Sequence, residues 1–201
     1  MATLKEISYD LLQSIQKKNV DDAAIDLRSI YFWVKNQRSI WVKNEVSKNH
    51  GTSHKFIQDL GSLAVSADGT YKKTEAIPLP IHVRSQPHIT RVGHATISNH
   101  DYIFLPYESA KYHSNGKFNS GLVAAFYYNS RIYIKGTITS ISTINVRGVF
   151  EDPMDVSGMT INSEYPIDEH LINYMKDEII KLDIKQFILV PEDVVNDGTN
   201  S

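Results

Sequence analysis

The sequence predicts an α+β protein with an N-terminal helical hairpin, a central mostly antiparallel β region, and a C-terminal helix followed by an extended tail. Apolar residues recur at helical spacing near both ends of the 201-residue chain, whereas the middle consists of short apolar segments separated by turn-forming residues. We therefore expect three regions: the hairpin at 1–51, the β-rich core at 52–166, and the C-terminal helix with an acidic tail at 167–201.

The first helix is expected from Leu4 to Lys17, where four apolar residues fall at helical spacing: Leu4, Ile7, Leu11 and Ile15. Thr3 and Glu6 have the spacing of a capping box, in which each side chain accepts a hydrogen bond from a backbone amide of the first turn.

The second helix is expected to begin after Asn19, with Asp21 and Asp22 in its first turn, and to end around Lys48 before a glycine. One apolar stripe holds Leu27, Ile30, Val34 and Trp41, but four more apolar residues lie off it: Phe32, Trp33, Ile40 and Val42. Apolar surface on several sides means that the helix is covered from more than one direction. The cover is either the first helix together with the β region, or another subunit.

Between Phe56 and Phe150 the pattern changes to short strands separated by turns. AAFYYNSRIYIKG predicts a hairpin with a tight turn at Asn129–Ser130. Its alternation places Ala125, Tyr127 and Tyr133 on one face of the hairpin, and Phe126, Tyr128 and Ile132 on the other.

The stretch INVRGVFEDP, residues 144–153, ends the β region. Its alternation directs Ile144, Val146 and Phe150 to one face, and Asn145, Arg147 and Val149 to the other. Gly148 removes a side chain from the buried row, as expected where another backbone approaches closely or the strand bends. Glu151 and Asp152 follow at the exit, before a proline that ends the pairing.

The last helix is expected from Asp168 to Leu182, with one apolar stripe formed by Leu171, Met175, Ile179 and Leu182. Asp177 and Lys181 are spaced to pair at i and i+4. The run KQFILV then precedes an acidic, glycine-bearing end. This run can complete the chain's own sheet, or it can add to an exposed sheet edge of a neighbouring chain.

Composition and motifs give no support to several classes of function. The chain has no cysteine, and it lacks the motifs of nucleotide-binding loops, zinc proteases and the hydrolase nucleophile elbow. Its eight histidines do not form the close pairs typical of metal ligands. No window is apolar enough to span a membrane, and no secretory signal is evident. We therefore predict no enzymatic activity, no cofactor, no metal site and no membrane partner.

Charge is distributed unevenly along the chain. Residues 71–150 hold nine Lys and Arg against three acidic residues, whereas residues 151–201 hold three against twelve. The basic middle is compatible with nucleic-acid binding, but its charges are scattered. Alternatively, the basic middle of one copy meets the acidic end of the next, as a head-to-tail ring requires. The two regions can also meet within one subunit.

Several segments resemble the structural neck proteins of crAss-like bacteriophages. These are AAIDLRSIYFWVKNQRSIWVKNE in the helical hairpin, and FIQDLGSL, PHITRVG, YESAKYHSNGKFN, RIYIKG and INVRGVFEDP in the β region. The resemblance covers most of the chain, is most specific from Phe56 to Pro153, and includes no catalytic motif. It implies a structural role without an active site.

The resemblance further implies a virion protein that forms a ring of the head-to-tail connector, below the portal and above the tail. Such a ring is expected to be twelvefold and to surround the channel through which DNA leaves, without sequence-specific contacts. Its partners would be copies of itself, the portal protein and adjacent neck and tail ring proteins, and assembly would take place in the host cytoplasm. An acidic segment facing the lumen would keep DNA from adhering to the wall. The alternative is an accessory nucleic-acid-binding protein that uses the basic region 71–150.

The sequence also suggests where copies or rings make contact. We expect Arg147 and the Glu151–Asp152 pair to lie at such a contact; the rival interpretation is a plain strand followed by a solvated turn. The full set of candidate contact residues is Trp33, Arg38, Trp41, Arg84, Arg91, Arg147, Glu151, Asp152 and Phe187.

Overall fold

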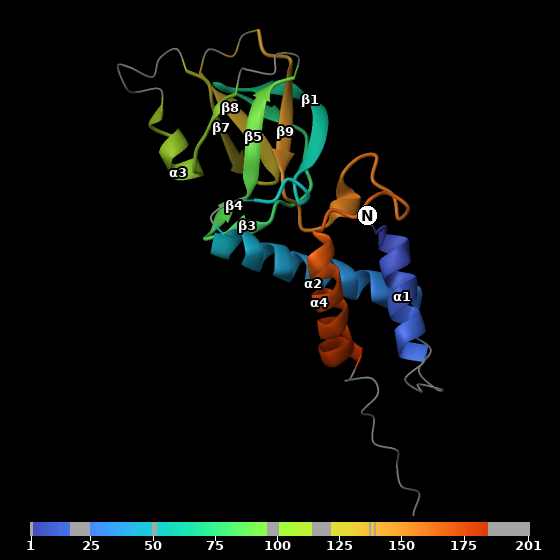
Figure 1. The fold of residues 1–201 in the computed structure, drawn as a ribbon. Helices are drawn as coiled ribbons and strands as arrows, with labels where there is room; N and C mark the ends of the chain where they lie inside the picture. The colour runs from blue at the N-terminus through green and yellow to red at the C-terminus, as the bar shows by residue number, and fades with distance from the viewer. Residues whose placement is uncertain are drawn as a thin grey trace, which may run out of the picture.

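The computed structural model of the chain describes residues 2–16, 25–49, 52–95, 101–113, 122–136, 138 and 140–184. A seven-stranded sheet lies over a layer of helices, in which the long helix α2 (Leu27–Asn49) passes beneath the sheet (Figure 1). Helices α1 (Leu4–Gln16) and α4 (Glu169–Glu178) both pack against α2. The prediction of an α+β protein is confirmed.

Helix α1 forms as its sequence predicts. Thr3 donates its backbone amide to Glu6 Oε2 at 2.8 Å, and Glu6 donates its amide to Thr3 Oγ1 at 3.1 Å, which completes the capping box. The predicted stripe of Leu4, Ile7, Leu11 and Ile15 is buried in the apolar core that α1 shares with α2 and α4.

Helix α2 begins later than predicted. Ile25 and Asp26 are not helical, and the Asp26 carbonyl accepts hydrogen bonds from the amides of Ser29 and Ile30 at 3.0 and 3.3 Å. Asp26 therefore stands at the position that precedes the first helical residue of α2, and the predicted first turn at Asp21 and Asp22 lies outside the described residues. Acidic residues favour both the cap and the first turn of a helix, and the sequence offers several of them in succession.

The sheet has the strand order β5–β9–β1–β2–β8–β7–β6, and its described pairs are antiparallel except for β6–β7. In chain order the strands are β1 (Gln58–Asp68), β2 (Tyr71–Thr74), β5 (Ile89–His94), β6 (Ile103–Phe104), β7 (Ala124–Tyr128), β8 (Arg131–Lys135) and β9 (Thr143–Gly148). A two-stranded hairpin of β3 (His82–Val83) and β4 (Gln86–Pro87) and the short helix α3 (Tyr107–Ala110) lie beside the sheet.

The two outermost strands of the sheet meet. Tyr102 donates its amide to the Val92 carbonyl at 2.8 Å, and Gly93 forms an antiparallel bridge with Asp101. The sheet therefore closes into a small barrel whose interior is filled by apolar side chains, including Ile132, Ile144 and Phe150. Closure leaves little exposed edge between β5 and β6 to which another strand can add.

The β7–β8 hairpin forms around Asn129 and Ser130, whose φ angles of 47° and 58° fit the predicted tight turn. The predicted grouping of its side chains is wrong at Ile132 and Tyr133, because Ile132 pairs with Tyr127 and lies in the barrel core. Tyr128 pairs with Arg131 across the turn, so Tyr133 pairs with Phe126 and points away from the barrel interior. Residues directly opposite each other in a ladder share one face of the sheet.

The end of β9 joins the barrel to the helical layer. Ile144 and Val146 point into the barrel, and a Cβ added to Gly148 would lie 3.0 Å from the His88 carbonyl oxygen, which confirms the predicted close approach. Val149 is buried in the helical core and Phe150 in the barrel core.

Helix α4 differs from the prediction at its end. The α-helix stops at Glu178 and continues as the wider π-helical segment η3 (Ile179–Ile184), which changes the i+4 spacing on which the predicted stripe and ion pair depend. Leu182 is consequently exposed, and Lys181 Nζ lies 3.7 Å from Glu178 Oε1 in place of the predicted pair with Asp177. The run KQFILV lies outside the described residues.

Candidate subunit interface

The Glu-Asp-Pro exit of β9 is bound to helix α2. Ser39 Oγ donates to the Glu151 carbonyl at 2.8 Å, Lys35 forms an ion pair with Asp152, and Lys43 Nζ lies 3.9 Å from Glu151 Oε1. Asp152 also accepts the Met154 amide at 2.9 Å and thereby caps the short 3-10 helix η2 (Pro153–Asp155). The two acids therefore fix the turn where the chain leaves the barrel.

The same residues form one wall of a groove along the outer side of α2. The groove encloses about 450 Å³. Phe32 is 60% exposed and Ile40 is 51% exposed, although both are large apolar side chains on one helix. The α2 groove is lined by Phe32, Lys35, Asn36, Ser39, Ile40, Lys43, Glu151 and Asp152. Among the described elements, α1, α4 and the barrel pack against other sides of α2 and leave this side open.

Arg38 lies on the inner side of the same helix and is completely buried. Its Nε donates to the Pro166 carbonyl and its Nη1 to the Phe150 carbonyl, each at 2.9 Å, while the guanidinium carbon lies 5.7 Å from the centre of the Tyr165 ring. Burial lowers the pKa of Arg38 to about 10, although Tyr165 and Asp152 partly oppose this. One side chain of α2 thus holds the exit of β9 and the segment before α4.

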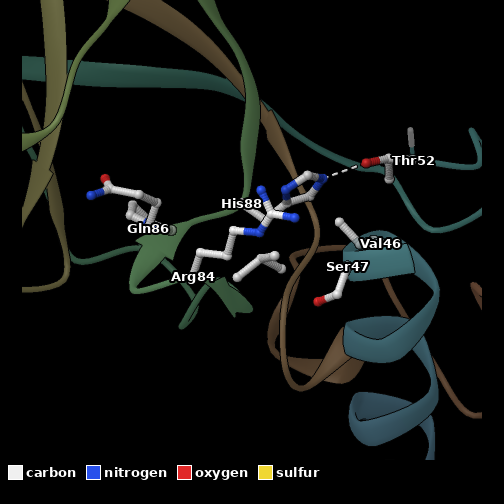
Figure 2. Close-up of a pocket in the computed structure, with 8 residues that line it drawn as sticks. Val46, Ser47, Thr52, Arg84, Gln86 and His88 are labelled. Carbon is white, nitrogen blue, oxygen red and sulfur yellow. Dashed lines mark hydrogen bonds between the residues drawn. The ribbon is translucent and has the colours of Figure 1, made fainter. Parts of the chain in front are cut away.

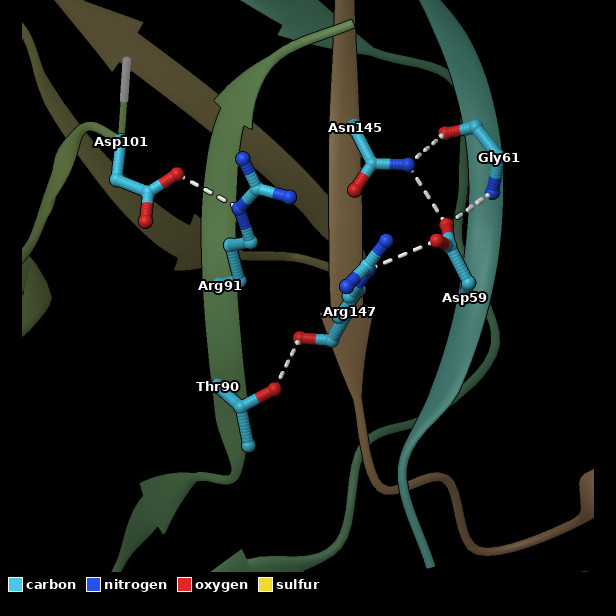
Figure 3. A network of polar contacts seen from close by, with 7 residues as sticks. All are labelled: Asp59, Gly61, Thr90, Arg91, Asp101, Asn145 and Arg147. Atoms are coloured by element: carbon cyan, nitrogen blue, oxygen red, sulfur yellow. Dashed lines mark hydrogen bonds and ion pairs between the residues drawn. The ribbon is translucent and has the colours of Figure 1, made fainter. Parts of the chain in front are cut away.

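A polar network crosses the outer face of the barrel over β5, β9 and β1 (Figure 3). Arg147 Nε donates to Asp59 Oδ2 at 2.8 Å, and Arg91 Nε donates to Asp101 Oδ1 at 2.6 Å. Asn145 donates to Asp59 Oδ1 at 2.7 Å, and Thr90 Oγ1 donates to the Arg147 carbonyl at 3.2 Å. Arg91 and Arg147 also line a hollow of about 480 Å³ on this face.

Asp59 is the centre of this network. Partial burial acts to raise the pKa of its carboxyl, but hydrogen bonds from the Gly61 amide, Asn145 and Arg147 outweigh that effect and lower the pKa. The Gly61 amide reaches Asp59 Oδ1 at 2.8 Å because Gly61 adopts a φ of 71°, next to a bulge in β1. Asp59 therefore stays ionised and holds Arg147 in place.

A third hollow, of about 210 Å³, lies where the end of α2 meets the β3–β4 hairpin (Figure 2). Thr52 Oγ1 contacts His88 Nε2 there, and burial lowers the pKa of His88. Arg84 lies at the hairpin tip with a φ of 50°, a backbone conformation that residues other than glycine adopt infrequently. Arg84 is exposed, and its predicted role in a contact stays a prediction.

The structure distributes the predicted contact residues over several places. Arg91 and Arg147 share the barrel face, and Glu151 and Asp152 share the α2 groove, so Arg147 and the acidic pair belong to different surfaces. Trp41 is half-buried and stacks on Tyr174, with the ring centres 6.0 Å apart. Phe187 lies outside the described residues.

Trp33 and Arg38 are enclosed in the protomer. Trp33 belongs to the helical core, and Arg38 has no exposed surface. Arg38 has no surface with which to touch a neighbour and Trp33 is 8% exposed, so both serve the protomer's core, and their predicted role in subunit contacts stays a prediction. The sequence pattern cannot distinguish these two from Phe32 and Ile40, which lie on the open side of the same helix.

Sequence reasoning also missed an aromatic cluster on the outer face of the barrel, formed by Tyr71, Tyr107, Phe126, Tyr128 and Tyr133. The signal for this cluster was the alternation of aromatic residues in the β7–β8 hairpin, which places Phe126, Tyr128 and Tyr133 on one face when Tyr128 is paired with Arg131.

Within the described residues, no group of three or more His, Cys, Asp or Glu side chains is placed to hold a metal ion. The described helices include none that is both long and apolar enough to cross a membrane. The surfaces found are grooves and ion-pair networks suited to contacts between proteins.

Comparison with known proteins places these surfaces in context. Residues 6–201 match the family model for phage tail ring protein 2 of crAss-like phages. No curated protein matches the chain. The family match covers almost the whole sequence, helices and barrel alike, and its members are structural components of the virion. The chain therefore belongs to the phage tail ring protein 2 family of crAss-like bacteriophages.

Proposed function

We propose that the protein self-associates through the α2 groove into a twelvefold ring of the neck, positioned below the portal and above the tail, around the channel through which DNA leaves the capsid. The observation that carries this proposal is the open side of α2, where two large apolar side chains lie in solvent beside ordered ion pairs. A ring protein needs a surface of this kind for each neighbour.

The α2 groove has the anatomy of a protein interface. Phe32 and Ile40 provide an apolar centre, and the pairs Lys35–Asp152 and Lys43–Glu151 provide a polar rim. In a closed ring each subunit presents two different surfaces to its two neighbours. We assign the α2 groove to one of these surfaces, and the barrel face with Arg91 and Arg147 to contact with a neighbouring copy or the next ring.

The charges favour a structural role over nucleic-acid binding. Arg91 and Arg147 are the basic residues on the barrel face of Figure 3, and each is bound to a carboxylate of the same protomer. Neutralised arginines attract phosphate weakly. We further propose that part of the acidic region 151–201 faces the lumen, where like charge lets DNA pass without adhering.

The test combines Phe32→Asp with Ile40→Asp and measures assembly by mass photometry and negative-stain imaging, with and without portal complex. Both side chains are exposed in the protomer, so the double variant is expected to keep its fold while rings and portal-bound assemblies are lost. Ile161→Asp is the matched control, because Ile161 is an exposed apolar residue outside the groove. A double variant that assembles like the wild type contradicts the assignment.

A further inference from the structure

The outer face of the barrel carries a pocket built from aromatic rings. Phe126 forms its floor: the Tyr133 ring stacks on it at 5.3 Å, and the rings of Tyr71 and Tyr107 meet it at 5.7 and 5.8 Å. Tyr107 and Tyr128 stack on each other at 4.5 Å, which ties α3 to β7. We call this the aromatic pocket; its lining is Asp68, Tyr71, Tyr107, Lys111, Phe126, Tyr128 and Tyr133.

The aromatic pocket is not part of the barrel core. Ala125 and Ile134 point inward at neighbouring positions of the same two strands, so Phe126 and Tyr133 point outward. Tyr107 is 37% exposed and Tyr128 is 48% exposed, whereas Phe126 beneath them is buried. The enclosed volume is about 260 Å³. An apolar cavity of about 150 Å³ holds a benzene ring, so the aromatic pocket has room for a phenyl side chain and an aliphatic neighbour.

Charged side chains of both signs surround the aromatic pocket: Lys111 and Asp68 line it, paired with Glu108 and Lys73, and Lys135 lies beside it. Lys111 Nζ lies 4.8 Å from the centre of the Tyr107 ring, and Lys135 Nζ lies 5.8 Å from the centre of the Tyr71 ring. Lys135 Nζ also donates to the Lys111 carbonyl at 3.0 Å, which fixes the end of α3 against β8. The Lys135 ammonium group has no carboxylate partner among the described residues, so an apolar floor beside it fits an aromatic residue that is followed by acidic ones.

The terminal segment of this chain has that composition. Residues 185–201 contain Phe187-Ile188-Leu189-Val190, then Pro191-Glu192-Asp193. The described chain ends at Ile184, beyond α4, which points away from the barrel in Figure 1. The basic middle and acidic end of the sequence are also complementary in charge. The barrel edges meet, so the apolar run has little open edge on which to add a strand.

We propose that the aromatic pocket receives Phe187 and the acidic residues after it from a neighbouring copy of the chain. The inference rests on the proposed ring, because it assumes copies held side by side. Each subunit would then be linked to the next by a terminal segment in addition to the contact at the α2 groove.

The test titrates a fluorescent peptide of residues 185–201 into the full-length Phe187→Ala protein, whose own segment competes about tenfold more weakly. Fluorescence anisotropy is measured at a protein concentration where sizing shows monomers. We expect saturable binding that weakens about tenfold with Tyr128→Ala, and similarly when Phe187 of the peptide is replaced by Ala. Tyr112→Ala is the matched control, because Tyr112 is exposed near α3 but does not line the pocket.

A charge-exchange experiment distinguishes a loss of binding from a failure of the variant to fold. Lys111→Glu is a change at the exposed rim, and it is expected to weaken binding of the wild-type peptide. A peptide carrying Glu192→Lys and Asp193→Lys should restore binding to Lys111→Glu but bind the wild-type rim poorly. Absence of peptide binding, binding indifferent to Tyr128, or an equal loss of binding with the control Tyr112→Ala overturns the proposal. Because the titration uses monomers, its outcome is independent of whether rings form.

Discussion

Arg38 provides the most informative single substitution, because its guanidinium holds two parts of the fold together. It reaches from α2 to the Phe150 carbonyl at the end of β9 and to the Pro166 carbonyl before α4. Arg38→Met keeps an unbranched apolar side chain but removes both hydrogen bonds. Arg38→Ala also removes the aliphatic stem from the core.

The expected magnitudes follow from these contacts. Leaving two buried carbonyls without a partner costs about 2 kcal/mol each. Against this, the pKa of Arg38 is lowered to about 10 from 12.5 by burial, and its Nη2 has no hydrogen-bond partner among the described residues. Removing this charge from its buried position therefore recovers about 3 kcal/mol of the free energy of unfolding. We expect Arg38→Met to lower the free energy of unfolding by about 1 kcal/mol. Arg38→Ala should lower it by about 3 to 4 kcal/mol, because three buried methylenes are also lost.

The assay is urea unfolding at neutral pH followed by two signals. Both tryptophans of the chain, Trp33 and Trp41, lie on α2, so their fluorescence reports the helical layer, while far-ultraviolet circular dichroism reports the whole fold. We expect the two signals to coincide in the wild type and to separate in Arg38→Ala, because the link between the layers is cut. Coincident transitions in Arg38→Ala, or a loss of stability in Arg38→Met as large as in Arg38→Ala, would refute this reasoning.

Three further predictions concern local features. Gly148→Ala should lower stability by about 1 to 3 kcal/mol, because its Cβ would lie 3.0 Å from the His88 carbonyl oxygen; an unchanged melting temperature would contradict the close approach. The folded-state pKa of Asp59 is lowered, so its ionised form stabilises the fold above its unfolded pKa of about 4, and this contribution is lost as pH falls through the folded value. Asp59→Asn should therefore be less stable at neutral pH and show a shallower acid transition, whereas parallel acid curves would argue against the network. Thr3→Ala should destabilise by about 1 kcal/mol through the loss of the capping box with Glu6, and chemical denaturation that gives wild-type stability would show that this cap is dispensable.

Local patterns determined the parts of the fold that the sequence predicted well. The spacing of Leu4, Ile7, Leu11 and Ile15 and the capping box at Thr3 are properties of one helix, and the structure has both. The turn at Asn129–Ser130 likewise depends on a few neighbouring residues. The close approach at Gly148 involves His88 from a distant part of the chain, and only the glycine itself indicated it.

Features that depend on distant segments were not predictable in the same way. Arg38 resembles an exposed residue of an amphipathic helix, and only the approach of Phe150 and Pro166, more than a hundred residues away, makes it a buried donor. The open side of α2 is equally hidden in the sequence, since Phe32 and Trp33 are adjacent aromatic residues and only one is covered. Barrel closure depends on the bridge between Gly93 and Asp101, which no periodicity reveals.

The sequence predicted only part of the α2 groove. Glu151 and Asp152 were expected at a contact, and they line the groove, but Arg147 lies on the barrel face instead. The pairing of β9 with β1 and β5 places Arg147 opposite Asp59 and Arg91, whereas the chain turns toward α2 after Phe150. A contact site that spans two layers cannot be read from one strand.

The most direct test of the account is the mass distribution of the purified wild-type protein, alone and after mixing with portal complex, followed by imaging of any heavy fraction. The account predicts a discrete ring of twelve copies, either formed by the protein itself or assembled on the portal. A protein that remains monomeric and indifferent to the portal at all concentrations tested would contradict the proposed position in the neck.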